Sequence, residues 1–297
     1  MDPARRESLI FVVGSASLDY LARSEHIPLP GETLLAQKLG SRPGGKGANQ
    51  AVAIARLGAA VEMVGCYGND AAGEVLRTAL NREGVGTRFF RSRPGESGST
   101  WITLGADGQN SILVFPGANS LLSPADLPAE LASAAWAVFQ LEAPLETFRA
   151  GADLVHHGGG QVILNAAPAM KLSAEDLAKV DVLVVNELEA TTLTGLDLDS
   201  AAQILGQVPT LVITLGAQGA YYSGDGEGRL PAFGVPVADT TGAGDAFVGA
   251  LTVALSEGKT LPEAVNWANA AGALATTKPG AQTGPTRAEI NAFLSHA

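Results

Sequence analysis

The segment DTTGAGDAF at residues 239–247 places one carboxylate, Asp245, behind two glycines and ahead of an apolar run. Gly242 and Gly244 permit backbone conformations that other residues avoid, and helical apolar spacing begins at Phe247. A helix N-terminus presents unpaired N–H groups and partial positive charge, which suit a phosphate or a developing oxyanion. A carboxylate there can accept the proton of an attacking hydroxyl during phosphoryl transfer. The segment fits either a catalytic base or a carboxylate that only complements the helix dipole.

A second glycine turn lies near the N-terminus, in the segment RPGGKGANQAVAIARLG. Gly44 and Gly45 precede a helical pattern whose first turn carries Lys46 and Asn49. Adjacent glycines let a ligand approach the backbone closely, and an asparagine amide offers both a donor and an acceptor to neighbouring hydroxyls. Taken alone, the segment also fits a tight connection from a strand to a helix with a solvated lysine.

Asp19 follows the first apolar run, in the segment GSASLDY. A carboxylate at this point can accept hydrogen bonds from two hydroxyls at once, each worth about 1.5–3 kcal/mol. By itself, Asp19 fits a turn residue equally well.

Other classes of function lose support from missing motifs and from the charge. The Gly258-Lys259-Thr260 ending of a phosphate-binding loop is present, but Val253 stands where its first glycine is required. No G-x-G-x-x-G follows a strand, which argues against a dinucleotide-dependent dehydrogenase. A formal net charge of −11 leaves no basic patch for a nucleic acid.

The elements that must position these residues follow an α/β pattern. Short apolar runs such as LIFVVG, VEMVGCYG and TLVITLG alternate with segments of helical period, which predicts a mostly parallel, doubly wound sheet covered by helices on both faces. GSTWITLG and SILVFPG alternate around the turn ADGQN and predict an antiparallel hairpin. We expect one domain over residues 1–297, with a small β-sheet lid formed near 17–41 and 98–116.

The remaining features favour a cytoplasmic protein without disulfides. No apolar stretch approaches the ~18 residues of a membrane span, and the N-terminal apolar run is too short for a signal peptide. The single cysteine, Cys66, is expected to be a buried thiol. His156 and His157 are expected in a solvated helix end rather than a metal site. Trp101 is expected to pack in the lid or at a subunit interface rather than under a sugar.

The motifs taken together resemble the ribokinase family, also called the PfkB sugar kinases, over nearly the whole chain. The ordered set is more specific than any one of its members: GSxxxD at 14–19, PGET at 30–33, GGKGANQA at 44–51, PGAN at 116–119, QLEAPLE at 140–146, LNAAPA at 164–169, NELE at 186–189, ITLGAQG at 213–219 and DTTGAGDAF at 239–247. The resemblance implies one doubly wound α/β domain with a β-sheet lid, and dimers that form through the lids.

For the chemistry, the resemblance implies transfer of a phosphoryl group from ATP to the primary hydroxyl of a sugar. Asp245 would be the base, and the amides of Gly242, Ala243 and Gly244 would form the anion hole. Alignment of the reactants and stabilisation of the negative charge would then supply most of the catalysis. The implied sugar pocket consists of Asp19, Ser17, Gly44, Gly45, Lys46, Asn49 and Glu142.

The resemblance also implies cofactor sites. Asn186 and Glu189 would organise Mg²⁺ and the phosphates through water, because magnesium sheds its waters reluctantly. The implied nucleotide pocket consists of Thr214, Gly216, Gly244 and Asn269. A monovalent cation, usually potassium, would lie among Asp239, Thr241, Ala275, Lys278, Gly280 and Gly284. Gly284 departs from a serine that is common at one of these positions.

Two departures bear on the substrate. Ser17 stands where the family's ribose kinases commonly have asparagine, and Arg42-Pro43 replaces a small or aromatic pair that borders the sugar. We expect phosphorylation of the 5-hydroxyl of D-ribose, while deoxyribokinase, fructokinase and nucleoside kinase activities stay open. A catalytically silent sugar-binding regulator would have lost the base or the anion hole, and the sequence keeps both.

Overall fold

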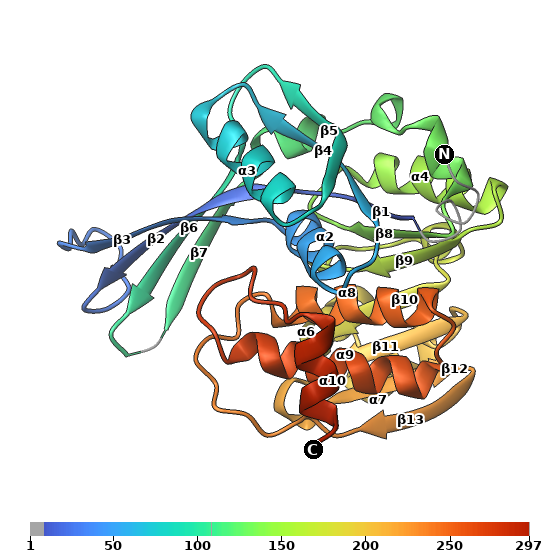
Figure 1. The fold of residues 1–297 in the computed structure, drawn as a ribbon. Helices are drawn as coiled ribbons and strands as arrows, with labels where there is room; N and C mark the ends of the chain where they lie inside the picture. Colours follow the sequence, from blue (N-terminus) through green and yellow to red (C-terminus); the bar gives the residue numbers. More distant parts are fainter. Residues whose placement is uncertain (1–8, 108, 297) are drawn as a thin grey trace.

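The computed structural model describes residues 9–107 and 109–296. Within them, the main sheet has the order β13-β12-β11-β10-β9-β8-β1-β4-β5 (Figure 1). Its strands are parallel from β5 to β11, and β12 and β13 add an antiparallel pair at one edge. The bounds are β1 (Ile10–Val13), β4 (Val61–Gly68), β5 (Gly86–Arg93), β8 (Trp136–Gln140), β9 (Gln161–Asn165), β10 (Val182–Asn186), β11 (Thr210–Thr214), β12 (Ala220–Gly224) and β13 (Gly226–Leu230).

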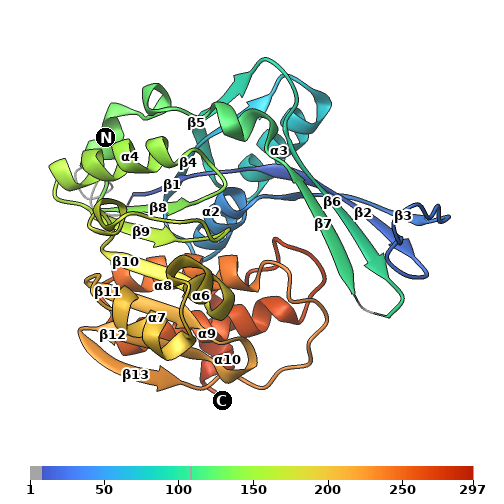
Figure 2. The ribbon, with the colours of Figure 1, turned by 180° about the vertical axis from the view of Figure 1, so that it is seen from behind.

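Helices cover both faces of this sheet, as its nearly continuous apolar strands require (Figures 1 and 2). One face carries α2 (Lys46–Arg56), α3 (Ala71–Arg82), α8 (Ala243–Ser256), α9 (Leu261–Thr276) and α10 (Arg287–Leu294). The other carries α4 (Leu145–His157), α5 (Ala174–Leu177), α6 (Glu187–Thr194) and α7 (Leu198–Leu205). The predicted fold class is confirmed. The antiparallel strands β12 and β13 at one edge of the sheet were not predicted.

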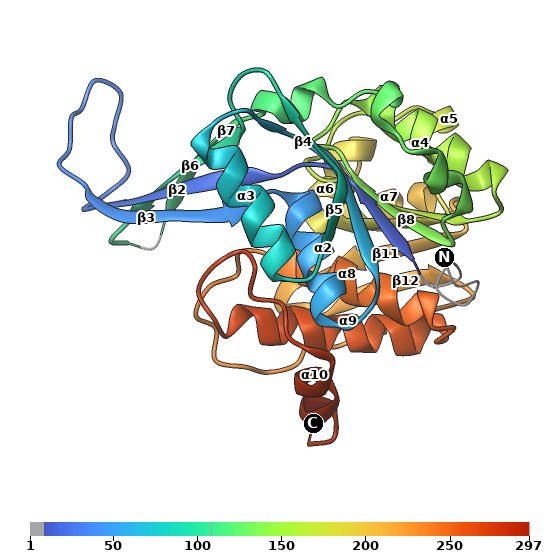
Figure 3. The ribbon, with the colours of Figure 1, turned by 45° about the horizontal axis from the view of Figure 1, so that its top comes forward.

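A separate sheet of order β3-β2-β6-β7 forms the predicted lid. Its strands are β2 (Ser17–Ser24), β3 (Gln37–Gly44), β6 (Gly98–Gly105) and β7 (Asn110–Phe115). The expected hairpin is the antiparallel pair β6 and β7, although residue 108 of its turn lies outside the described residues. Figure 3 shows the lid extending away from the main sheet beyond α3. Trp101 stacks on Tyr20 with ring centroids 5.0 Å apart, so it packs within the lid.

The carboxyl edge of the main sheet gathers polar side chains. Strands β8, β9, β10 and β11 end at Gln140, Asn165, Asn186 and Thr214 respectively. Ligands of open α/β sheets bind outside the carboxyl ends of the strands. The fold therefore places a candidate site at this edge, beneath the lid.

Three minor expectations can be compared with the structure. Cys66 is a buried free thiol, as expected. His156 lies at the end of α4, as expected, but its side chain is not fully solvated. Its Nε2 lies 2.9 Å from a carboxylate oxygen of Asp181. In the described part of the chain, no helix combines the length and the apolar character needed to cross a membrane.

Candidate active site

Helix α8 begins where DTTGAGDAF predicted a helix start. Gly242 precedes it in a left-handed conformation with φ of 75°, and a Cβ atom there would lie 2.0 Å from the carbonyl oxygen of Ala281. A side chain at this position would therefore meet both backbone strain and a clash. A Cβ on Gly244, by contrast, would meet no atom within 4 Å. Gly244 thus faces open space beside the first turn of the helix.

Asp245 lies in that first turn and is only 8% exposed. Asn49 Nδ2 donates to its Oδ2 at 2.9 Å, and Gln50 Nε2 donates to its Oδ1 at 3.0 Å. Both donors come from α2, so the structure brings together the two glycine turns that the sequence separates. A carboxylate buried in this way is not a surface residue that merely complements a helix dipole.

The charges around Asp245 are strongly coupled. Burial raises the pKa of Asp245 above the ordinary value of an aspartate, and the positive charge of Lys46 and the two amide donors offset this only in part. Burial would lower the pKa of Lys46, but the carboxylates of Asp245, Glu142 and Glu189 raise it above its usual value. The site therefore contains a carboxylate of increased basicity beside a lysine that keeps its charge.

The amides predicted as an anion hole are not equivalent. The N–H of Ala243 donates to the carbonyl oxygen of Thr240 at 3.2 Å, so it is already engaged. Among the hydrogen bonds of the described residues, none starts from the N–H of Gly242 or Gly244. These two amides, at the N-terminus of α8, are the ones that can receive an anion.

A cavity of about 200 Å³ lies in front of these groups. It brings together the candidate base, the two glycines, Lys46 and the Asn186 and Glu189 pair. The predicted residues Asp19, Ser17, Asn49, Glu142, Gly216 and Asn269 are not among those that line it. Its lining consists of Lys46, Asn165, Ala167, Val184, Val185, Asn186, Glu189, Thr214, Gly242, Gly244, Asp245 and Val248.

The predicted sugar-binding residues gather where the lid meets the main sheet. Ser17 and Gly44 are partners in the register of β2 and β3, and Ser17 Oγ donates to Asp19 Oδ1 at 2.9 Å. A Cβ atom on Gly44 would lie 2.1 Å from Asp19 Oδ2, so only glycine leaves room for this carboxylate. Burial raises the pKa of Asp19, against the lowering effect of hydrogen bonds from Ser17 and Thr100. Thr100, opposite Asp19 on β6, was missed by the sequence analysis.

Glu142 has a structural role as well as its predicted one. Its Oε2 accepts from the hydroxyl of Ser15 at 2.5 Å and from the backbone N–H of Lys46 at 3.0 Å. The carboxylate thus binds the first amide of α2, where negative charge is favoured. Ser15, which the sequence analysis also missed, lies between the first strand and this helix.

Asn186 and Glu189 form a reciprocal capping box at the start of α6. Asn186 Oδ1 accepts from the Glu189 N–H at 2.7 Å, and Glu189 Oε2 accepts from the Asn186 N–H at 2.8 Å. Burial raises the pKa of Glu189, while its hydrogen bond from Asn186 and the nearby Lys46 lower it. The second carboxylate oxygen stays available, and a water-mediated contact to Mg²⁺ suits this arrangement.

The other predicted nucleotide-binding residues differ in whether they line the cavity. Thr214 ends β11 and lines the cavity, and Gly216 follows it with φ of 54°. Asn269 lies on α9, and its Nδ2 donates to the carbonyl of Pro231 at 3.4 Å. Of these three residues, Thr214 alone is among those that line the cavity.

The predicted cation loop is held by hydrogen bonds. Asp239 Oδ1 accepts from the N–H and the hydroxyl of Thr241 at 2.9 and 2.6 Å, and its Oδ2 accepts from the Gly280 N–H at 2.9 Å. Burial acts to raise the pKa of Asp239, but these bonds outweigh it and lower the pKa. Thr283, which was not predicted, donates its hydroxyl to the carbonyls of Ala275 and Gly280 at 3.0 and 3.1 Å.

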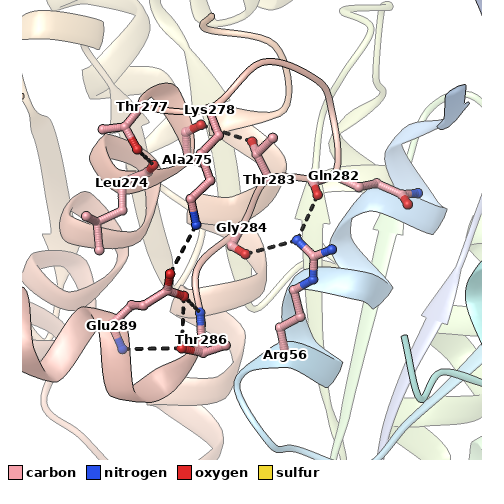
Figure 4. A network of polar contacts seen from close by, with 10 residues as sticks. All are labelled: Arg56, Leu274, Ala275, Thr277, Lys278, Gln282, Thr283, Gly284, Thr286 and Glu289. Carbon is pink, nitrogen blue, oxygen red and sulfur yellow. Dashed lines mark hydrogen bonds and ion pairs between the residues drawn. The ribbon is translucent and has the colours of Figure 1, made fainter. Parts of the chain in front are cut away.

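Figure 4 shows how this loop is anchored. Arg56 Nη1 donates to the carbonyls of Gln282 and Gly284 at 2.7 and 3.1 Å, so the Gly284 carbonyl is bound to α2. Lys278 Nζ contacts Glu289 Oε1 on α10 at 3.0 Å. Among the described residues, no group of His, Cys, Asp and Glu could hold a metal on its own. A cation in this loop would therefore need carbonyl and hydroxyl oxygens in addition to the carboxylate of Asp239.

Arg42 lies opposite Asp19 in the register of β2 and β3, and its side chain makes a contact that was not predicted. Its Nη1 donates to the carbonyl of Pro279 at 3.2 Å, in the cation loop. A Cβ atom on Gly280 would lie 2.9 Å from the same nitrogen. The long side chain of Arg42 leaves the lid strand β3 and reaches across to the segment after α9.

Comparison with known proteins agrees with this geometry. The model of the pfkB family carbohydrate kinases matches residues 7–288, and the chain belongs to that family. The protein is therefore a phosphotransferase with an alcohol group as acceptor. Ribokinase of Bacillus subtilis is 41% identical over 292 residues (96% of this chain, 99% of the relative), and that of Haemophilus influenzae is 39% identical over 300 residues (96% and 98%). The structure of Arabidopsis thaliana ribokinase with ribose and ATP has a TM-score of 0.90 at 32% identity, covering 98% of this chain and 99% of that one.

Proposed function

We propose that this protein is an ATP-dependent ribokinase, which transfers the γ-phosphoryl group of ATP to the 5-hydroxyl of D-ribose. One observation carries the proposal: the buried carboxylate of Asp245 lies at the N-terminus of α8, in the same cavity as Lys46 and Glu189. Ribokinases with about two fifths identical residues, and a neighbouring ribokinase structure that contains ribose and ATP, support this choice of substrates.

The sugar would bind where the lid meets α2. Asp19 supplies a carboxylate that can accept from two hydroxyls, and Asn49 Oδ1 is a buried acceptor without a hydrogen-bond partner among the described residues. Buried polar groups without partners are costly, so a hydroxyl that donates to Asn49 Oδ1 would remove that cost. Glu142, Lys46 and the backbone of Gly44 and Gly45 complete the polar wall that we assign to the sugar.

Asp245 would take the proton of the attacking hydroxyl. Burial raises its pKa, which makes it a stronger base than an exposed aspartate, and the charge of Lys46 favours its ionised form. The free amides of Gly242 and Gly244 would bind the oxygens on which negative charge develops. The chain therefore supplies a base, a positive charge and an anion hole around one small space.

Cofactors complete the proposed site. Asn186 and Glu189 would orient water on Mg²⁺, Thr214, Gly216 and Asn269 would contact the nucleotide, and Mg²⁺ would neutralise charge on the phosphates. We further propose that the loop with Asp239, Thr241, Ala275, Lys278 and Gly280 binds a monovalent cation such as K⁺. The Thr283 hydroxyl would provide the side-chain oxygen that Gly284 lacks.

We also propose that the lid belongs to the same domain as the main sheet and pairs with a second copy. Strand β7 is a fully exposed lid edge that carries Ile112, Leu113, Val114 and Phe115, each more than half exposed. An apolar edge strand of this kind favours pairing with another chain. Sedimentation equilibrium tests this, because a dimer that Val114→Lys dissociates supports lid pairing and a monomeric wild type contradicts it.

The function is tested by measuring ADP release with ATP and a panel of sugars and nucleosides. We expect ribose to give the highest kcat/KM, and ³¹P NMR to identify ribose 5-phosphate as the product. A higher kcat/KM for a hexose or a nucleoside would contradict the substrate assignment. No turnover while ribose still binds would show a sugar-binding protein instead of a kinase.

Deoxyribose is a second candidate substrate because of Ser17. Serine is shorter than asparagine, and its hydroxyl already donates to Asp19. A pocket that makes fewer hydrogen bonds to a hydroxyl discriminates less against a sugar that lacks it. We therefore expect 2-deoxyribose to be a slower substrate, and Ser17→Asn to increase the preference for ribose.

A further inference from the structure

A chain of buried amide side chains lies behind the candidate base. Gln140 ends β8, Gln50 lies in α2 and Asn165 ends β9, with exposed fractions of 2%, 0% and 8%. Gln50 and Gln140 do not line the cavity and cannot touch a ligand in it. Gln50 reaches the cavity through its hydrogen bonds to Asp245 and Asn165, which both line it.

The hydrogen bonds of this chain are continuous. Gln140 Nε2 donates to Gln50 Oε1 at 2.6 Å. Gln50 Nε2 then donates to Asn165 Oδ1 and to Asp245 Oδ1, both at 3.0 Å. Asn165 Nδ2 donates to the carbonyl of Val184 at 3.2 Å.

The Asn165 end of the chain determines how Gln50 is oriented. Because the Val184 carbonyl can only accept, Asn165 must present its nitrogen to Val184 and its oxygen to Gln50. Gln50 then presents its own oxygen to Gln140 Nε2, and Gln140 Oε1 is buried without a hydrogen-bond partner among the described residues. The Gln50 amide therefore directs both of its N–H bonds at oxygen atoms, one of which belongs to the base. The reversed amide would place Gln50 Oε1 against a carboxylate oxygen, which would be repulsive.

We propose that Gln50 is a positioning residue for Asp245, and that Gln140 helps to hold Gln50 in this orientation by donating to its Oε1. The bond from Gln50 fixes Oδ1 of Asp245, so that the carboxylate cannot rotate and its Oδ2 faces Asn49 and the sugar side of the site. The same bond favours the charged form of the carboxylate. This inference rests on the proposed function, since it assigns Asp245 the role of a base.

The principal test replaces Gln50 with methionine, which has a similar volume and no amide. A hydrogen bond to a charged group is worth roughly a tenfold to hundredfold change in an equilibrium, so we expect kcat to fall by about that factor. We expect the KM for ribose to change by less than about threefold, because Gln50 does not reach the sugar pocket. The acid limb of the kcat/KM profile should move to higher pH, because a donor that favours the ionised base has been removed.

A variant that acts one residue further away separates positioning from folding. Gln140→Met keeps Gln50 and its packing against Asp245 but removes the donor that orients it. We expect a smaller decrease in kcat and a smaller shift of the acid limb than in Gln50→Met. Should Gln50→Met fail to fold, Gln140→Met decides the question.

Thr147→Val is the matched control. Thr147 is 1% exposed and donates a hydrogen bond of 2.9 Å to the Leu122 carbonyl on the opposite face of the sheet. Its loss should lower the unfolding temperature without moving the pH profile. A ¹³C NMR titration of the Asp245 carboxyl, assigned by its absence in Asp245→Asn, gives a readout that does not need turnover, and we expect Gln50→Met to raise this pKa.

The outcomes distinguish this inference from the proposed function. A wild type that phosphorylates no sugar contradicts the proposed function. An active wild type whose kcat, acid limb and Asp245 pKa are unchanged by both glutamine variants contradicts the role of Gln50 alone. A Gln50→Met variant that raises KM and leaves kcat intact would also contradict it.

Discussion

Asp245 and the pair Asn186 and Glu189 line one cavity but are held in different ways. Asp245 is buried, and both of its carboxylate oxygens accept hydrogen bonds from α2. Asn186 is exposed, and Asn186 and Glu189 use their side chains on each other's backbone. Preorganised groups need no rearrangement at the moment of reaction, whereas exposed ones gain their final order when a ligand binds. Asp245 is thus positioned before substrates bind. We expect the surroundings of Asn186 and Glu189 to become fully ordered only when a nucleotide binds.

Among the variants that test this comparison, Asp19→Asn in the proposed sugar pocket should have the largest effect on a kinetic constant. The variant keeps the shape of the side chain but loses the charge that strengthens hydrogen bonds to sugar hydroxyls, so the KM for ribose should rise about a hundredfold. Steady-state kinetics measure this, with the exposed Asp199→Asn as control. An unchanged KM would remove Asp19 from the sugar pocket.

A smaller effect is expected from Lys46→Met, read through the pH dependence of the rate. In its proposed role, Asp245 can accept a proton only when it is ionised, so activity should fall as the pH drops through its pKa, which burial raises. Lys46 lowers that pKa, so its removal should move the acid limb of kcat/KM to higher pH and reduce activity on that limb. A limb at the same pH in both proteins would show that another group controls it.

On the nucleotide side we expect Glu189→Gln to act more weakly. Glutamine can still accept from the Asn186 N–H, and only the charge toward Mg²⁺ is lost, so the KM for MgATP should rise about threefold to tenfold. The KM for ribose should stay constant, as a titration at saturating ATP can show. A loss as large as that of Asp19→Asn would break the distinction between the two sides.

The smallest effect on catalysis is expected from Arg56→Met, which removes the anchor of the cation loop (Figure 4). Arg56 contacts Glu83 at 2.6 Å as well as the Gln282 and Gly284 carbonyls, so its loss should cost about 1–3 kcal/mol and several degrees of unfolding temperature. Calorimetry compares it with Arg77→Met, an exposed pair with Glu74, which should change little. Equal unfolding temperatures would mean that the loop is not anchored through Arg56.

The sequence predicted those features that leave a local pattern. Apolar runs and helical spacing predicted the sheet, and the alternation around ADGQN predicted the lid hairpin. Glycine turns predicted the start of α8 and hence the location of Asp245. A residue was predictable when its own segment required it there.

The features that were missed depend on contacts between distant segments. Gln50 bonds to Gln140 across 90 positions and to Asp245 across 195, and neither contact changes the local pattern of the chain. The side-chain contact of Arg42 was not predicted either, because its long side chain spans the gap to Pro279, 237 positions away. Such contacts follow from packing and not from spacing.

The central claim is that Asp245 is the base of a phosphoryl transfer in a site already built to bind the sugar. Its most direct test measures turnover and ribose binding in the same Asp245→Asn protein, the first by ADP release and the second by isothermal titration calorimetry. The account predicts that kcat falls by about 10²–10⁴ while the ribose Kd stays within about threefold of the wild-type value. Turnover within tenfold of the wild type would contradict it.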